Sequence, residues 1–344
     1  MKESQQHNTI LDLAAALKLS PATVSRALNN TSYVKSETKQ RVLEMAEKLG
    51  YRKNSMAAGL RNNKTNTVGI ILPKISMYFH AAVVTEIQNL LHNQGYNLII
   101  GQSNDDPSLE KEMADTFFSS RVDALIVACT LKTLDFSHFD IFSAHHIPIL
   151  FYDRVPPESY KARVIKGDDF KGGFLAGQHL AECGSKRIAL ICGPLTSNLY
   201  QDRSAGFKSA LETYQLPIDE ELFFYQSLTS ENTEKALDQM LSGQNPPDAI
   251  FVTSDKNAIT VMTYAREHGI AVPEQLRVVG YSNDPLTAMM SPPITTIEQF
   301  PQAFGIGVVQ TLMEMLRNQK ELAPAVTSLD PVITPVELIK RKST

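Results

Sequence analysis

The chain has 344 residues, of which 43% are hydrophobic and 20% are charged, and its formal net charge is -4. This composition is typical of a folded globular protein and excludes a disordered one, while the length indicates two or three folding units. No window approaches 18 uncharged apolar residues, and no apolar signal-peptide core follows the polar first residues. We therefore expect no membrane partner. Because Cys129, Cys183 and Cys192 form no CxxC pair, we also expect a cytoplasmic protein with reduced cysteines and no metal site.

The charge is unevenly distributed along the chain. Residues 1–66 contain 11 Lys or Arg and 5 Asp or Glu, a net charge of +6, whereas the remaining residues have a net charge of -10. A basic head on an acidic body is typical of a protein whose head binds a polyanion. Chance segregation of surface charge explains the same numbers equally well, so the charge alone does not decide between the two.

Three short helices are predicted in the basic head. The first spans about 10–17 behind a polar cap, with apolar residues at helical spacing. The second begins at Pro21, where the missing N–H of proline is not needed, and is preceded by the capping candidate Ser20. The third runs from Ser36 to Leu49 and ends at Gly50. Two short helices braced by a third predict a helix-turn-helix.

A helix-turn-helix places the N-terminal end of its second helix in the major groove of DNA. Arg26 can donate two hydrogen bonds to a guanine edge, and Ala22 can contact a thymine methyl group. Hydroxyl and amide side chains suit phosphate contacts, and here they are Ser20, Thr23, Ser25 and Asn29. The alternative is a three-helix packing module without a DNA role, which the basic charge and the outward position of Arg26 disfavour.

The head resembles that of the LacI/GalR family of transcriptional regulators. The S-x-x-T-V-S-R-x-L-N core, the following V-x-x-x-T-x-x-x-V and the closing L-G-Y occur in the family's order and spacing. The resemblance implies that Pro21 and Ala22 occupy variable base-reading positions. It also implies a set of DNA-contacting residues, namely Thr9, Ser20, Pro21, Ala22, Thr23, Ser25, Arg26, Asn29, Tyr51, Asn54, Ala57 and Leu60.

A polar stretch after Tyr51 predicts a linker with a possible short helix from Ser55 to Arg61. From the residues alone, the apolar Leu60 is expected to pack on the body. The resemblance implies instead a hinge helix whose Leu60 wedges into the minor groove and kinks the duplex, with small residues such as Ala57 allowing two hinge helices to approach. Gly59 lowers helix stability by roughly 1 kcal/mol relative to alanine, so we expect this helix to form only in the DNA-bound dimer.

The body alternates short apolar strands, such as V-G-I-I-L-P, A-L-I-V-A-C and R-I-A-L-I-C, with amphipathic helical stretches. This pattern predicts an α/β fold with two lobes of doubly wound parallel sheet and a cleft between them. The expected domains are a head at 1–52, a hinge at 53–66 and a core at 67–344. We expect the chain to cross between the lobes near 165, 297 and 328.

No enzyme motif is present in the body. There is no GxxxxGK[ST] loop, no HExxH and no GxSxG turn, and His145-His146 has no third metal ligand. The segment Lys171-Gly-Gly is predicted to be a turn and is too irregular for a dinucleotide fingerprint. We therefore expect no enzyme activity, no catalytic residue and no cofactor.

The body also resembles the LacI/GalR core, through pieces such as F-Y-D-R, D-R-x-x-G-F-K-S-A-L, T-S-D and G-Y-S-N. The resemblance implies a sensor core like that of periplasmic sugar-binding proteins. The implied effector residues are Ser76, Tyr78 and Phe79 on one wall, Asp153 and Arg154 on the floor, Arg203 as the gripping residue, and nearby Asp255 and Ser282. Many family members carry an aspartate at the place of Ser282. From the residues alone, each has an ordinary structural role: a packing pair, a helix cap or a surface ion pair.

Taken together, these patterns predict a ligand-responsive repressor. It is expected to bind a pseudo-palindromic DNA operator as a homodimer and to sense a small polar molecule, a sugar or sugar derivative, although Arg203 equally suits a carboxylate or phosphate. Because no leucine heptads follow P-V-E-L-I-K-R, a dimer is expected and not a tetramer. The rival classes are a periplasmic binding protein, which would lack the basic head, and a doubly wound enzyme, which would need a catalytic constellation.

Overall fold

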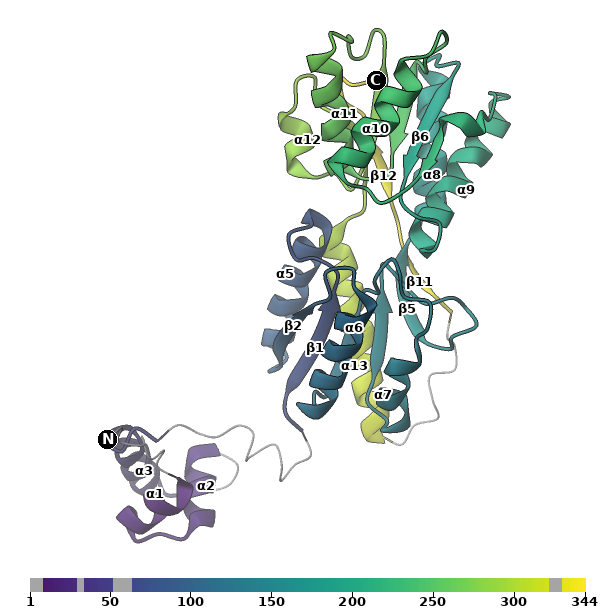
Figure 1. The fold of residues 1–344 in the computed structure, drawn as a ribbon. Helices are drawn as coiled ribbons and strands as arrows, with labels where there is room; N and C mark the ends of the chain where they lie inside the picture. Colours follow the sequence, from purple (N-terminus) through teal and green to yellow (C-terminus); the bar gives the residue numbers. More distant parts are fainter. Residues whose placement is uncertain (1–8, 30–33, 52–63, 322–329) are drawn as a thin grey trace, which may run out of the picture. The chain divides into compact units, whose positions relative to one another are not determined.

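The computed structural model describes residues 9–29, 34–51, 64–321 and 330–344 (Figure 1). The chain divides into two compact units, Met1–Thr65 and Asn66–Thr344, which are described separately below. Within the described ranges, no helix is both long and apolar enough to span a membrane.

The first unit is the predicted bundle of three helices: α1 (Ile10–Leu17), α2 (Pro21–Asn29) and α3 (Ser36–Lys48). Its core consists of apolar side chains that recur at helical spacing on each helix, including Leu13, Val24 and Val42, all fully buried. The start of α1 is fixed by a capping box, in which the Thr9 amide donates to the Asp12 carboxylate at 2.7 Å and the Thr9 hydroxyl accepts from the Asp12 amide.

The second unit contains two six-stranded sheets. The first sheet has the order β11-β5-β4-β3-β1-β2, and all its pairings are parallel. Its strands are β1 (Thr67–Leu72), β2 (Asn97–Gln102), β3 (Ala124–Val127), β4 (Ile149–Tyr152), β5 (Arg163–Gly167) and β11 (Val332–Thr334). The second sheet has the order β12-β10-β9-β8-β6-β7. Its strands are β6 (Ile188–Cys192), β7 (Phe223–Tyr225), β8 (Ala249–Val252), β9 (Arg277–Tyr281), β10 (Thr295–Glu298) and β12 (Glu337–Ile339).

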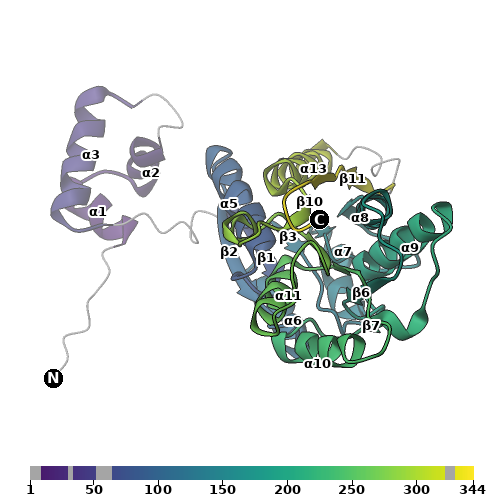
Figure 2. The same cartoon turned by 90° about the horizontal axis from the view of Figure 1, so that it is seen from above.

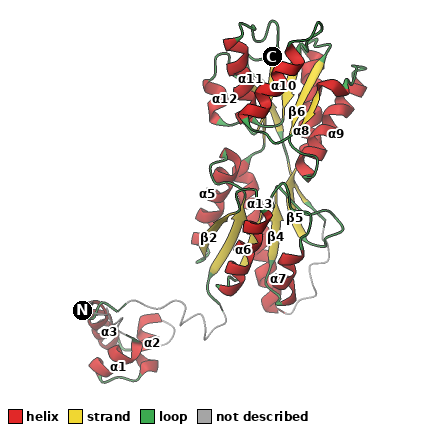
Figure 3. Cartoon of the chain, in the orientation of Figure 1, coloured by secondary structure: helices red, strands yellow, loops and turns green. Residues whose placement is uncertain are grey.

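The predicted doubly wound α/β fold with two lobes is confirmed, except that the edge strand β12 runs antiparallel to β10. Helices surround each sheet (Figure 3). The first lobe carries α5 (Tyr78–Asn93), α6 (Pro107–Ser119), η1 (Ser137–Phe139), α7 (Asp140–Ala144) and α13 (Pro301–Glu321). The second lobe carries α8 (Asp169–Glu182), α9 (Asn198–Thr213), η2 (Glu220–Leu222), α10 (Ser230–Leu241), α11 (Asp255–Glu267) and α12 (Pro285–Met289).

The chain passes between the lobes three times (Figure 1). The first passage follows Gly167, and the second follows Glu298 and leads into α13, which packs beside α5 on the first sheet. The third lies between Thr334 and Glu337, further along the chain than the expected position near 328. Because all three connections join the same two lobes, they can act as a hinge about which the lobes open and close.

The helices α8 and α9 pack side by side in the second lobe (Figure 2). The prediction of a turn at Lys171-Gly-Gly is wrong, because these residues lie inside α8. The glycines are needed for close approach: a Cβ on Gly173 would lie 2.0 Å from the Arg203 carbonyl oxygen, and one on Gly206 would lie 1.8 Å from the Phe170 carbonyl oxygen. This close packing places the first turn of α8 against Arg203.

Candidate functional site

One side of α2 presents three of its predicted contact residues to solvent. Pro21, Ala22 and Arg26 are exposed, whereas Val24 and Ala27 on the same helix are buried in the head core. Thr23 and Ser25 are half-buried. The helix therefore has its apolar side packed and its predicted reading side open, which is the arrangement a recognition helix requires.

The remaining predicted head residues are placed only in part. The Ser20 and Thr23 hydroxyl oxygens lie 2.8 Å apart, and the Thr23 amide donates to Ser20 at 3.1 Å, so Ser20 caps α2 as predicted. Tyr51 packs against the head core. The side chain of Asn29, and all of Asn54, Ala57 and Leu60 with the predicted hinge helix, lie outside the described residues.

In the body, the contacts between the lobes come from segments near the carboxyl ends of the strands. The Asn198 side chain at the start of α9 accepts a hydrogen bond from the Val155 amide at 3.0 Å and donates one to the Asp153 carbonyl at 3.1 Å. The Thr196 hydroxyl donates to the Leu131 carbonyl at 2.8 Å. Carboxyl ends of parallel strands are where ligands bind in open α/β sheets.

Asp153 directly follows β4 and is 5% exposed, with a left-handed backbone at φ 59°. Its carboxylate makes no hydrogen bond among the described residues; the nearest partner is His80 Nε2 at 3.8 Å. Burial, reinforced by the charge of Asp169, raises the pKa of Asp153 to about 6. Burial, together with Arg154, lowers the pKa of His80 to about 3, so its ring is neutral and supplies no counter-charge. A buried carboxylate that accepts no hydrogen bond and sits on a strained backbone is typical of a functional position.

The two predicted arginines are both buried and both paired with carboxylates. Arg154 donates from Nη1 to Asp105 and leaves its Nε buried without a partner. Arg203 donates from Nε to Asp169 at 2.8 Å and from Nη1 to the Thr253 carbonyl at 3.0 Å. Its guanidinium carbon lies 3.6 Å from the centre of the Tyr281 ring. Arg154 directly follows Asp153. The helix α9 carries Arg203, the partner of Asp169, and reaches the Asp153 backbone through Asn198. These four residues, Asp153, Arg154, Asp169 and Arg203, are here called the interlobe cluster, and the charges of the other three act on the pKa of Asp153.

Asp255 and Ser282 lie on the second lobe and have partners there. Asp255 accepts from the Thr296 hydroxyl at 2.6 Å and the Asp284 amide at 2.7 Å, and burial raises its pKa to about 7. Ser282 has φ 121° and donates to the Gln299 side chain at 2.9 Å. These bonds fix the loop after β9.

The three residues predicted for the wall differ in exposure. Ser76 is exposed and Tyr78 is half-buried, with a pKa raised by burial and by the charges of Glu298 and Asp284. Phe79 is buried in the first lobe core and meets Phe304 of α13 edge-on, with ring centres 5.3 Å apart.

Sequence reasoning missed His80, Asp105, Asp169 and Asn198. The sequence offered a signal for Asp169, because polar residues such as Asp168-Asp169 directly after a strand lie at the edge of the sheet where ligands bind. Asn198 lies in a polar run after β6, which is where ligand-facing loops are found. His80 lies in α5 and Asp105 lies between β2 and α6, and nothing in their neighbouring sequence marks either one as a site residue.

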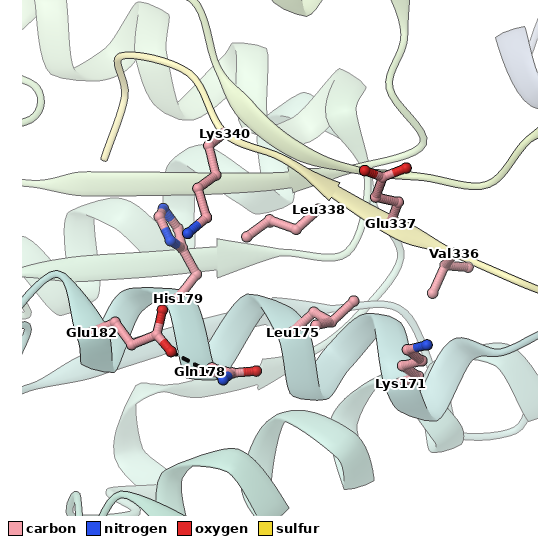
Figure 4. A pocket seen from close by; sticks show the side chains of 9 residues that line it. All are labelled: Lys171, Leu175, Gln178, His179, Glu182, Val336, Glu337, Leu338 and Lys340. Carbon is pink, nitrogen blue, oxygen red and sulfur yellow. Dashed lines mark hydrogen bonds between the residues drawn. The ribbon is translucent and has the colours of Figure 1, made fainter.

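A surface groove lies elsewhere on the second lobe, between α8 and β12 (Figure 4). Leu175 and Leu338 lie in its middle, and Lys171 and Lys340 lie toward its two ends. None of the predicted effector residues lines it, and no residue that lines it has a buried side-chain atom without a hydrogen-bond partner, as Arg154 and Asp169 have. The interlobe cluster is therefore the stronger candidate. Within the described parts of the chain, no group of three His, Cys, Asp or Glu residues is placed to hold a metal ion.

Comparison with known proteins agrees with both units. Residues 9–54 match the model of bacterial regulatory proteins of the lacI family, and residues 178–344 match that of the periplasmic binding protein-like domain. The HTH-type transcriptional repressor PurR of Haemophilus influenzae (strain PittEE) is 31% identical over 97% of this chain and 98% of its own. The HTH-type transcriptional regulator DegA of Bacillus subtilis (strain 168) is 29% identical over 98% of each chain. The Lac repressor dimer bound to operator and the anti-inducer ONPF is similar in structure, with a TM-score of 0.84, 25% identity, and coverage of 98% of this chain and 99% of that one.

Proposed function

The chain belongs to the LacI family of bacterial regulatory proteins, and we propose that this DNA-binding transcription regulator is a ligand-responsive repressor acting as a homodimer in the cytoplasm. Two heads read the halves of a pseudo-palindromic operator, while the body senses a small polar molecule such as a sugar. The observation that supports this most directly is the open reading side of α2, with Pro21, Ala22 and Arg26 exposed on a helix whose other side is packed.

The contact set proposed for DNA is that of the resemblance. Arg26 reads a guanine edge, and Thr9, Ser20, Thr23 and Ser25 contact the phosphate backbone. The proposed hinge at 53–66 connects this head, at 1–52, to the core at 67–344. Its leucine, Leu60, inserts at the central base step, and the small Ala57 lets the two hinges approach.

A dimer is supported by apolar side chains at the body's surface. Ile99 and Ile100 on β2, the edge strand of the first sheet, are 44% and 42% exposed. On α12 of the second lobe, Leu286 and Met289 are 55% and 77% exposed. Exposed apolar residues on an edge strand favour covering by another chain. The similar Lac repressor structure is of a dimer, and a two-fold pair of heads suits a palindromic site.

The proposed effector site is built on the interlobe cluster. Asp153 supplies unused acceptor capacity, Arg154 and Arg203 supply positive edges, and Tyr78 supplies an aromatic face. Ser76, Phe79, Asp255 and Ser282 complete the proposed set, with Ser76 and Ser282 in loops, Phe79 in the first turn of α5 and Asp255 at the start of α11. A polar molecule with hydroxyl groups fits this mixture.

Coupling between effector and DNA is proposed to run through the lobes. A molecule bound between them changes their closure, and the first lobe is the one from which the chain continues toward the hinge and head. A ligand that prefers one closure state shifts the population of DNA-binding molecules, usually by about 1–3 kcal/mol of coupling.

The test screens a library of sugars and nucleobases for thermal stabilisation of the full chain. Each stabilising compound is then added to the protein bound to a duplex that the protein itself selects from random DNA. We expect at least one compound both to stabilise the protein and to change its affinity for that duplex. Stabilisation without any change in DNA affinity would contradict the proposed coupling.

A further inference from the structure

We propose that the groove between α8 and β12 is a docking site for another protein, which contributes an extended segment that adds to the edge of the second sheet. The segment carries an apolar side chain, with an acidic residue two positions before it and another two positions after it. None of the four residues of the interlobe cluster lines this groove, so the inference does not depend on the effector or on its site.

The backbone of β12 offers free hydrogen-bonding groups at the edge of the sheet. Among the described strands, β12 pairs with β10 alone. The Ile297 carbonyl of β10 accepts from the Ser282 amide, so the backbone groups of Ile297 face β9. Those of Leu338, which lies opposite Ile297, therefore point away from β10, and they have no hydrogen-bond partner among the described residues. Such an edge is where an extended peptide adds to a sheet.

The side of β12 that faces α8 is apolar and basic. Side chains alternate along a strand, so Leu338 and Lys340 lie toward α8 whereas Glu337 lies on the other side (Figure 4). Leu338 and Leu175 of α8 lie in the middle of the groove, which has a volume of about 360 Å³. An apolar side chain of the added segment is removed from water when it packs between these two leucines.

The two ends of the groove carry unpaired positive charge. Neither the Lys171 nor the Lys340 ammonium group forms an ion pair or a hydrogen bond among the described residues. The Glu182 carboxylate at the groove is held within the second lobe, where it accepts from the Gln178 amide at 3.0 Å and from the Tyr214 hydroxyl at 3.1 Å. Complementary charge therefore favours one acidic residue at each end of the bound segment.

The helix α8 sets the spacing of these two acidic residues. Burial and the charge of Lys340 lower the pKa of His179, and Lys340 lies beside His179 in the groove (Figure 4). His179 follows Lys171 by eight positions on α8, a rise of about 12 Å. An extended segment covers about 13 Å in four positions, with the first, third and fifth side chains on one face. The matching pattern is acidic-x-apolar-x-acidic.

A second copy of this chain does not supply that pattern. Another β12 would present Val336, Leu338 and Lys340 on the side that faces α8, and none of these is acidic. Its lysine would add to the two already present, and like charges across an interface weaken binding. The occupant is therefore a segment of a different protein.

The first experiment measures binding of the full-length protein to the capped peptide T-D-T-L-T-D-T by fluorescence anisotropy. The control peptides are T-K-T-L-T-K-T, with the charges reversed, and T-D-T-A-T-D-T, with the apolar side chain shortened. The first peptide is expected to bind about tenfold or more tightly than either control. Equal binding of all three peptides, or no binding at millimolar concentration, would overturn the inference.

The second experiment tests strand addition through the peptide backbone. Successive residues of a strand direct their N–H and C=O groups to opposite edges, so only alternate amides of the peptide face β12. Two peptides are compared, one N-methylated at the leucine and one at the adjacent threonine. One methyl group is expected to abolish binding and the other to change it by less than about threefold. Loss at the leucine indicates antiparallel addition opposite Leu338, and equal effects of the two methyl groups would contradict addition to β12.

The third experiment assigns the binding to the groove. Lys340→Glu is expected to weaken binding of T-D-T-L-T-D-T about tenfold or more and to strengthen that of T-K-T-L-T-K-T. Lys186→Glu is the matched control, since Lys186 is an exposed lysine of the second lobe that does not line the groove. An unchanged peptide preference in Lys340→Glu would overturn the inference. So would a peptide that lowers the mass of the protein in sedimentation velocity, because the groove would then join copies of this chain.

Discussion

The Asn198 side chain donates a hydrogen bond across the two lobes to the Asp153 backbone carbonyl, at 3.1 Å. The residue that receives this bond is the one whose carboxylate has no donor of its own among the described residues. If Asp153 recognises the effector as proposed, lobe closure and effector recognition meet at a single residue. A molecule bound to the Asp153 side chain acts on the segment that Asn198 holds.

Asn198→Ala should loosen lobe closure, because it removes two hydrogen bonds to the first lobe. At about 1 kcal/mol for each bond, effector affinity should fall roughly tenfold or more. Isothermal titration with the active compound measures this loss. Gln201→Ala is the control, since Gln201 donates only within its own lobe, to the Leu195 carbonyl. Equal effects of the two variants would show that Asn198 has no special part in closure.

Arg26→Ala should weaken binding to the selected duplex by about 1–3 kcal/mol and relax specificity at one base pair of each half-site. The exposed position of Arg26 on α2 is the reason. Fluorescence anisotropy on duplexes with single base changes measures both effects. Arg41→Ala, which removes an exposed arginine from α3, should leave the base preference intact. If Arg26→Ala kept the wild-type preference, the reading surface would lie elsewhere.

Ile100→Asp should convert the dimer to a monomer and abolish tight operator binding, because it puts a charge on the apolar edge strand β2. Sedimentation velocity measures the mass directly. Leu134→Asp provides a control, since Leu134 is 78% exposed but is not part of β2 or α12. A dimer that persisted in Ile100→Asp would remove β2 from the proposed interface.

The raised pKa of Asp153 predicts a pH-dependent difference in stability between wild type and Asp153→Asn. The folded protein holds this proton to about pH 6, against an ordinary value of 3.8. Protonated Asp153 therefore stabilises the folded state fully below pH 3.8. This contribution to the free energy of unfolding falls as the pH rises from 3.8 through 6, and it is absent above that pH. Because the variant cannot ionise, its melting temperature relative to wild type should be higher at pH 7.5 than at pH 4. A difference that stayed constant across this range would mean that Asp153 is not a destabilising charge in the folded protein.

The helix starts and the alternation of strands and helices could be predicted from the sequence, because both depend on residues close together in the chain. Ser20 and Pro21 start α2 as expected, and the alternation of apolar strands with helices indicated both lobes. Because glycine is common in turns, Lys171-Gly-Gly predicts a turn from sequence alone, although these residues lie in α8. Its glycines serve a contact with α9 that only the folded structure reveals.

The candidate site was predicted less completely, since its partners come from distant segments. Arg203 could be named from the sequence, but its pairing with Asp169 depends on how α8 packs on α9. The same holds for Arg154 and Asp105, which lie 49 positions apart. Phe79 is buried because α13, more than 200 residues later, returns to cover α5.

The central claim, that the head reads DNA sequence as part of a dimer, is tested most directly by selecting random duplex DNA with the full-length protein and titrating the enriched duplex with salt. We expect a pseudo-palindrome with a flexible central step, bound with a steep loss of affinity as salt rises. The selection is run both without added ligand and with the sugar and nucleobase library, so that a protein requiring a corepressor is also detected. Failure to enrich any sequence under either condition would contradict the account.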